Sequence, residues 1–164
     1  MTENSRSCGG CTACCEGWLS DESLGMKPGS PCANCTDHGC GIYETRPANP
    51  CRIFTCAWLQ NPDEFPEELR PDKSGAICSV DRDWYQWKVL RAFPVGASIP
   101  QHTFDWLLAY AKGKRLPFLF LEHTLENGQY VSVAENALGP PAFAAEVKSR
   151  PGMGDTFWGM TPRD

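Results

Sequence analysis

Nine of the ten cysteines of this chain lie between positions 8 and 56. They begin with the run CGGCTACC, in which three cysteines stand three positions apart and another follows at once. Two-residue gaps let consecutive thiolates fold around one metal ion, because the intervening backbone forms a turn whose amides point at sulfur. The spacing therefore predicts metal binding. The candidate ligands are the cysteines of this stretch.

The order of these motifs resembles one protein family. After CxxCxxCC come Pro31-Cys32, Cys40-Gly41-Ile42-Tyr43, Arg46-Pro47, and then Cys51 and Cys56. This pattern is similar to the CxxCxxCC, or YkgJ-like, cysteine-cluster family, which is described as zinc- or iron-chelating. The resemblance covers residues 8–58 and implies a metal-binding protein, but it implies no particular reaction. The ligands that it implies are Cys8, Cys11, Cys14, Cys15, Cys32, Cys40, Cys51 and Cys56. Cys35 and Cys78 lie outside the family pattern.

The ligands that the resemblance implies divide into two sites of four thiolates each, or they form one dinuclear cluster with bridging sulfurs. Ligation by sulfur alone and closed structural sites favour zinc, in a structural, carrier or adaptor role. The alternative is an iron–sulfur redox protein, because the first three cysteines match the opening of a bacterial ferredoxin run. Adjacent side chains diverge in most backbone conformations. We therefore predict that Cys14 and Cys15 serve different sites, with Cys15 joining Cys32, Cys40, Cys51 or Cys56.

Other residues could serve either the metal site or the fold. Arg46 either donates charge and hydrogen bonds to metal-bound thiolates, or it pairs with Glu44 or caps a loop. Tyr43 is expected in a small core, and His38 is expected to be an exposed loop residue rather than a substitute ligand. Cys78 stands in an apolar stretch, where a free cysteine behaves as a small buried hydrophobe.

Composition and motifs exclude several function classes. The formal net charge is -5 and no lysine- or arginine-rich run occurs, so nucleic-acid binding is not expected. No nucleophile elbow, phosphate loop or HExxH motif occurs, and catalysis has no positive support. The first residues lack the basic and apolar stretches of a secretion signal, and no apolar run is long enough to span a membrane. We therefore expect a cytoplasmic protein, with thiols rather than disulfides. Its expected partners are metal ions, and a partner protein is a further candidate.

The remaining pattern predicts an α+β fold, in which an irregular metal-knuckle region precedes a small antiparallel sheet of two hairpins with a packed helix. We expect a cysteine-rich region over 1–60, a body over 61–135 and a Pro/Gly-rich tail over 136–164, together forming one compact domain. Asn49-Pro50 predicts the start of a helix that continues to Leu59 and holds Cys51 in its first turn, and residues 60–75 read as a surface linker. The predicted strands are 76–80, 85–93, 117–125 and 129–134, with a helix from 98 to 112 between the hairpins.

Overall fold

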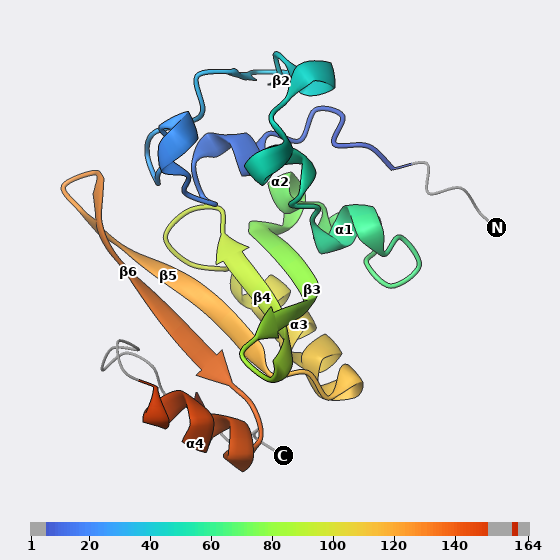
Figure 1. Cartoon of the computed structure of the whole chain (residues 1–164), viewed down its shortest axis with the longest axis vertical. Helices are drawn as coiled ribbons and strands as arrows, with labels where there is room; N and C mark the ends of the chain where they lie inside the picture. Colours follow the sequence, from blue (N-terminus) through green and yellow to red (C-terminus); the bar gives the residue numbers. More distant parts are fainter. Residues whose placement is uncertain (1–5, 151–158, 161–164) are drawn as a thin grey trace.

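A computed structural model describes residues 6–150 and 159–160 of the chain. A central β-sheet carries short helices on both faces, and the cysteine-rich region, residues 8–60, lies across one end of the sheet (Figure 1). The fold mixes helices and strands, as the sequence predicts. Within the described residues no helix has both the length and the apolar character needed to cross a membrane.

The central sheet has the strand order β3-β4-β5-β6-β7. Its strands are β3 (Ala76–Trp84), β4 (Trp87–Pro94), β5 (Phe118–Glu126), β6 (Gln129–Leu138) and the two-residue β7 (Gly159–Met160). The two predicted hairpins, β3–β4 and β5–β6, are present and antiparallel. The expectation of a purely antiparallel sheet is wrong, because β4 and β5 pair in parallel. The helix between them returns the chain to the same end of the sheet, as a parallel connection requires.

The two hairpin turns differ in how well the sequence located them. Asn127 and Gly128 form the β5–β6 turn with φ values of 50° and 76°, as the Asn-Gly signal predicts. The β3–β4 turn was expected at residues 81–83 but lies at Tyr85 and Gln86 instead. β3 continues through an irregularity in register between Ser79 and Arg82, where the sequence pattern suggested an end.

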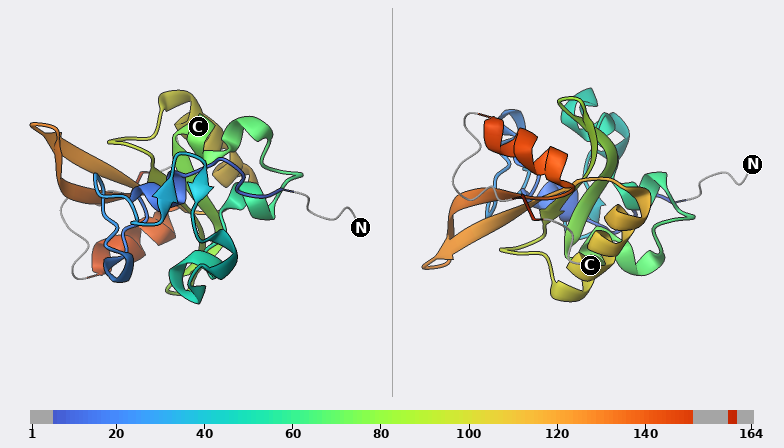
Figure 2. Two further views of the ribbon diagram at one scale, coloured as in Figure 1. Left: turned by 90° about the horizontal axis from the view of Figure 1, so that it is seen from above. Right: turned by 90° about the horizontal axis from the view of Figure 1, so that it is seen from below.

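Two helices cover opposite faces of the sheet (Figure 2). Helix α3 (Gln101–Lys114) packs Leu107 and Ala111 into the larger core together with Phe118 and Phe120. Helix α4 (Pro141–Ser149) buries Phe143 and Val147 against Leu119 and Ala137 on the other face. The sequence predicted α3 but treated the region of α4 as an irregular tail; Phe157 and Trp158, also assigned to that tail, lie outside the described residues.

The cysteine-rich region consists of short turns and one small hairpin. Its elements are η1 (Ala13–Glu16), η2 (Glu22–Leu24), β1 (Cys35–Thr36), β2 (Gly39–Cys40), η3 (Tyr43–Thr45), η4 (Ala48–Arg52) and α1 (Ala57–Gln60). The predicted single helix from Pro50 to Leu59 is wrong. The chain forms one turn of helix around Cys51, becomes extended at Cys56, and only then begins α1, with a cis peptide bond between Asn49 and Pro50.

The segment expected to be a surface linker contributes to the core. It contains the short helices η5 (Glu67–Leu69) and α2 (Pro71–Ser74). Phe65 is fully buried, with its ring centroid 5.2 Å from that of Trp106 and 5.0 Å from that of Tyr110. Prolines and acidic residues surround Phe65 in the sequence, and they concealed its role in packing.

Two sets of contacts join the cysteine-rich region to the rest of the fold. The Arg6 guanidinium donates hydrogen bonds to the carbonyl oxygens of Trp58 and Phe65, at 2.7 Å and 2.6 Å. Trp18 packs edge-on against Tyr130 with ring centroids 5.2 Å apart, and lies 6.0 Å from the ring of His123. The β5–β6 hairpin therefore reaches the cysteine-rich region, as Figure 1 also shows.

Candidate metal centre

A cavity of about 120 Å³ lies within the cysteine-rich region. It is lined by all of the predicted ligands, Cys8, Cys11, Cys14, Cys15, Cys32, Cys40, Cys51 and Cys56, and not by Cys35 or Cys78. Apolar side chains complete most of its wall, including Leu19, Met26, Ile42, Phe54 and Trp58. The fold thus gathers the predicted thiols, which are up to 48 residues apart in the sequence, around one space. We call this space the cysteine cavity.

Cys14 faces one set of these thiols. Burial raises the pKa of Cys14 well above its usual value, and the neighbouring thiols that raise it further are, in decreasing order, Cys56, Cys11, Cys8 and Cys15. The thiols of Cys8 and Cys11 also raise the pKa of Cys56. We call Cys8, Cys11, Cys14 and Cys56 the Cys14 group.

The thiols that raise the pKa of Cys15 differ from Cys56, Cys11 and Cys8, which raise that of Cys14, although Cys15 follows Cys14 directly. Burial raises its pKa to about 12, with further contributions from Cys40, Cys35, Cys32 and Cys51 in that order. Of these, Cys35 is the one that does not line the cavity. We call Cys15, Cys32, Cys40 and Cys51 the Cys15 group.

Local backbone turns present these sulfurs. The Cys11 amide donates to the Cys8 carbonyl at 2.8 Å, and the Cys35 amide donates to the Cys32 carbonyl at 3.0 Å. The CxxC segments 8–11 and 32–35 therefore close with the same hydrogen bond. The Asn34 amide lies 3.4 Å from Cys32 Sγ. This is the arrangement of amides around sulfur that the CxxC spacing predicts.

Cys56, not Cys51, has the helix amides near its sulfur. Cys56 precedes the first residue of α1, and the amides of Leu59 and Trp58 lower its pKa. Burial has the larger effect and raises the pKa of Cys56 to about 11. The sequence assigned this environment to Cys51, because it placed one long helix where the structure has two short ones.

Arg46 and Tyr43 form one edge of the cavity. The Arg46 guanidinium donates to the Tyr43 carbonyl at 2.5 Å and lies over the Tyr43 ring, 3.9 Å from its centroid. Its positive charge lowers the pKa of Cys51, although burial and the neighbouring thiols together raise it. The Arg46 hydrogen bond closes the η3 turn, which is the loop-capping role that the sequence also allows, and no ion pair between Arg46 and Glu44 occurs among the described residues.

Two other candidates, His38 and Cys78, lie away from the cavity. His38 is exposed in the turn between β1 and β2, as expected. Cys78 is 4% exposed within β3, and burial raises its pKa, which fits its predicted place in the core. The sequence did not reveal that Leu19, Met26 and Phe54 would form apolar walls around the thiols.

The sulfurs line the cavity without converging on a point. Within the part of the chain that the structure describes, no three His, Cys, Asp or Glu side chains are arranged to hold one metal ion. Thiols surround the space from several sides, so the chemistry of the donor set fits a thiophilic cation. For several of these thiols to bind one ion, their side chains have to move closer together.

Comparisons with known proteins found no matching protein family, no matching curated protein and no matching solved structure. The resemblance to the CxxCxxCC family therefore stays a prediction that rests on the cysteine pattern.

Proposed function

We propose that this protein binds two thiophilic metal ions, most simply zinc, and that they organise the cysteine-rich region. The observation that carries the proposal is the cysteine cavity, whose lining contains all of the predicted ligands and neither of the remaining cysteines. At four thiolates for each ion, the Cys14 group and the Cys15 group each supply one complete donor set.

A cation that binds in this space has to displace protons from the thiols. Burial and mutual repulsion raise the pKa values of Cys14, Cys15 and Cys56, so these thiols hold their protons at neutral pH when no cation is present. A divalent cation reverses this preference, because it binds the thiolate and releases the proton. Arg46 adds a fixed positive charge at the edge of the cavity, where it offsets part of the negative charge of bound thiolates.

The donor count favours a structural or carrier role over catalysis. A catalytic zinc keeps one position open for water, whereas four thiolates for each ion leave none. The apolar wall of the cavity also provides no general base. The alternative is an iron–sulfur cluster held by the same cysteines, which is favoured by the ferredoxin-like spacing of Cys8, Cys11 and Cys14.

Metal analysis of anaerobically purified protein tests the proposal. We expect about two equivalents of zinc and no acid-labile sulfide. Cys14→Ser and Cys15→Ser are each expected to lose about one equivalent, because each removes a ligand from a different group. Cys78→Ser is the matched control and is expected to lose none. Protein without metal would reject the proposal, brown protein with sulfide would establish the alternative, and loss of both ions from either single variant would reject the division into two groups.

The raised pKa of Cys56 predicts how the stability of the metal-free protein depends on pH. The unfolded thiol loses its proton near pH 9, whereas the folded thiol keeps it until about pH 11. Its stabilising contribution is therefore complete below pH 9 and is lost as the pH rises to 11, by up to about 3 kcal/mol. Urea unfolding of reduced, metal-free protein between pH 8 and pH 11 measures this loss.

Cys56→Ala is the control for this pH dependence, because other groups, such as Tyr110, also titrate in the alkaline range. The variant is expected to show a shallower fall in the free energy of unfolding than the parent protein over the same range. Equal slopes for the two proteins would contradict the assignment of the effect to Cys56.

A further inference from the structure

Cys35 and Cys40 stand directly opposite each other in the small hairpin of the cysteine-rich region. Strand β1 pairs with β2 in antiparallel register, with Cys35 opposite Cys40 and Thr36 opposite Gly39. On the other side of the cysteine pair, the Gly41 amide donates to the Asn34 carbonyl at 2.7 Å. Hydrogen-bonded positions thus flank the cysteine pair, which is the close, non-hydrogen-bonded kind.

The geometry of such a pair suits a disulfide. Opposing residues at a non-hydrogen-bonded position have Cα atoms about 4.5 Å apart and side chains on the same face. Disulfides bridge Cα separations of about 4.4–6.8 Å. No change of backbone is needed to join the two sulfur atoms.

The turn of the hairpin holds this register. Thr36 Oγ1 donates to the Gly39 carbonyl at 2.7 Å and accepts from the His38 amide at 3.2 Å. Gly39 has φ +123°, and a side chain there would meet the Gly9 carbonyl oxygen at 2.9 Å. The Thr36 side chain therefore closes the hairpin, and Gly39 packs against the first CxxC turn.

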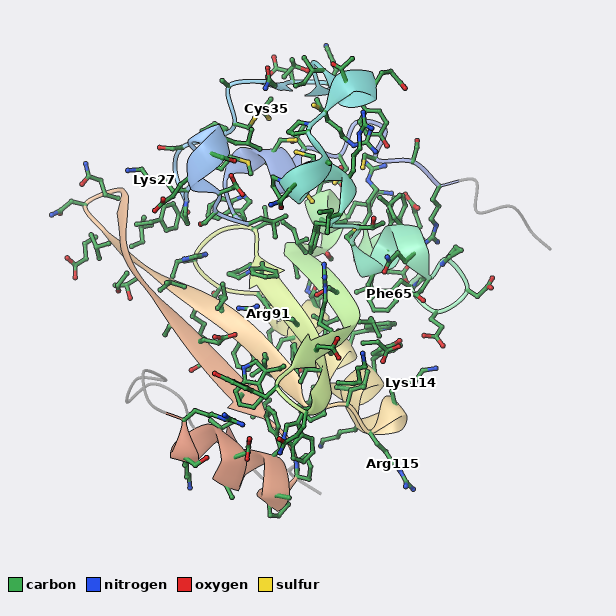
Figure 3. All side chains as sticks on the ribbon, viewed as in Figure 1. Lys27, Cys35, Phe65, Arg91, Lys114 and Arg115 are labelled. Carbon is green, nitrogen blue, oxygen red and sulfur yellow. The ribbon has the colours of Figure 1, made fainter. Side chains whose placement is uncertain are left out.

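The two thiols have different surroundings. Cys40 lines the cysteine cavity and belongs to the Cys15 group, whereas Cys35 does not line the cavity. The Cys35 thiol is partly exposed and has the Thr36 carbonyl as its contact, at 3.9 Å. Figure 3 shows Cys35 in the outer part of the cysteine-rich region, away from the central sheet. A thiol outside the cavity thus stands beside one of the proposed ligands.

We propose that Cys35 and Cys40 are a disulfide-forming pair, and that their oxidation withdraws Cys40 from the Cys15 group and releases its metal. The pairing rests on the hairpin alone. The release of metal rests on the proposed function.

Glutathione disulfide is an oxidant of the required class. The Cys35 thiolate attacks one of its sulfurs, forming a mixed disulfide and expelling one glutathione thiolate. The Cys40 thiolate then attacks the Cys35 sulfur and expels the second glutathione thiolate. Two protein thiols are oxidised, one glutathione disulfide is reduced to two thiols, and the two protons pass to the solvent or to the glutathione thiolates.

The first experiment identifies the bond in metal-free protein. Full-length protein is incubated with glutathione disulfide and cleaved beside Asp37, which separates Cys35 from Cys40, and the linked peptides are identified by mass spectrometry. We expect a Cys35–Cys40 disulfide in the parent protein and glutathione trapped on Cys35 in the Cys40→Ser variant. A disulfide joining Cys35 to Cys32 or to Cys15, or glutathione trapped elsewhere, would overturn the pairing.

The second experiment measures metal release from zinc-loaded protein with a chromogenic chelator. Glutathione disulfide is expected to release about one equivalent from the parent protein, at least about tenfold faster than from Cys35→Ser. Cys78→Ser is the matched control and is expected to behave as the parent. Equal release rates for the parent and Cys35→Ser would overturn the link to metal.

The two experiments separate the two proposals. Protein that takes up no zinc, yet forms the Cys35–Cys40 bond, contradicts the proposed function and supports the pairing. Protein that holds zinc but forms another disulfide contradicts the pairing and leaves the proposed function standing. Because Cys35 is partly exposed, Cys35→Ser is expected to keep the far-ultraviolet circular dichroism of the parent.

Discussion

Complete removal of metal is expected to loosen residues 8–56, so that they become more sensitive to protease than residues 76–149. Residues 8–56 bury few large apolar side chains, among them Met26, which is 6% exposed. Residues 76–149 contain Phe118, Leu107 and Phe143, which are 0% exposed. A structural zinc site contributes about 10–16 kcal/mol at neutral pH, which is as much as the whole stability of many domains. Limited proteolysis with mass spectrometry, before and after chelation, measures the difference.

Readdition of zinc to the metal-free protein is the control for this experiment. Protection of residues 8–56 is expected to return, which separates loss of metal from irreversible oxidation or aggregation. If residues 8–56 resist protease equally well after every ion has been removed, the contacts of Arg6, Trp18 and the buried Ala13 suffice to hold the region, and the metal is not its organising element.

Gly17→Ala is expected to disrupt the cysteine-rich region, with a loss of about 3–5 kcal/mol in the free energy of unfolding. Gly17 ends η1 with φ +105°, where an L side chain is strained. A Cβ there would stand 2.1 Å from the Lys27 carbonyl oxygen and 2.8 Å from that of Ser30. Lys27 and Ser30 are joined by two backbone hydrogen bonds, so relief requires the turn between them to open. Urea unfolding of the metal-loaded protein measures the loss.

Gly25→Ala is the matched control. Gly25 ends η2 with φ +64°, and a Cβ there meets no atom within 4 Å. Only the conformational cost of a left-handed residue remains, which is about 1 kcal/mol. Similar losses for the two variants would show that the approach of Gly17 to the 27–30 turn does not decide the stability of the region.

Local signals made part of the fold predictable. Asn127-Gly128 located the β5–β6 turn, and the spacing of Leu107 and Ala111 located α3. Each of these signals acts within a few residues, so it can be read without knowing what packs against it. The parallel pairing of β4 with β5 depends on how α3 packs on the sheet, which the strand pattern does not specify.

Weak or interrupted patterns concealed other elements. Helix α4 buries one narrow stripe, Phe143 and Val147, between prolines and glycines that are typical of loops. Around Cys51 the opposite error occurred, since Asn49-Pro50 resembles a helix start but the chain becomes extended again at Cys56. In both places contacts with distant residues decide the structure.

The arrangement of the cysteines could not be predicted from the sequence. The family pattern names the cysteines that line the cavity, whereas CxxC spacing alone would include Cys35, which does not line it. Which cysteine faces which partner depends on long-range folding: Cys56 approaches Cys14, and Cys51 lies in the neighbourhood of Cys15. The place of Cys35 opposite Cys40 likewise appears only once the hairpin is formed.

The direct succession of Cys14 and Cys15 has a consequence for how the protein fills with metal. One peptide bond joins the two groups, and the Cys32 amide also donates to the Cys15 carbonyl at 2.8 Å. An ion held by the Cys14 group fixes the backbone from which Cys15 projects, so the second ion binds to a chain that has already lost much of its conformational freedom. On the proposed function, binding of the first ion therefore lowers the conformational cost of binding the second.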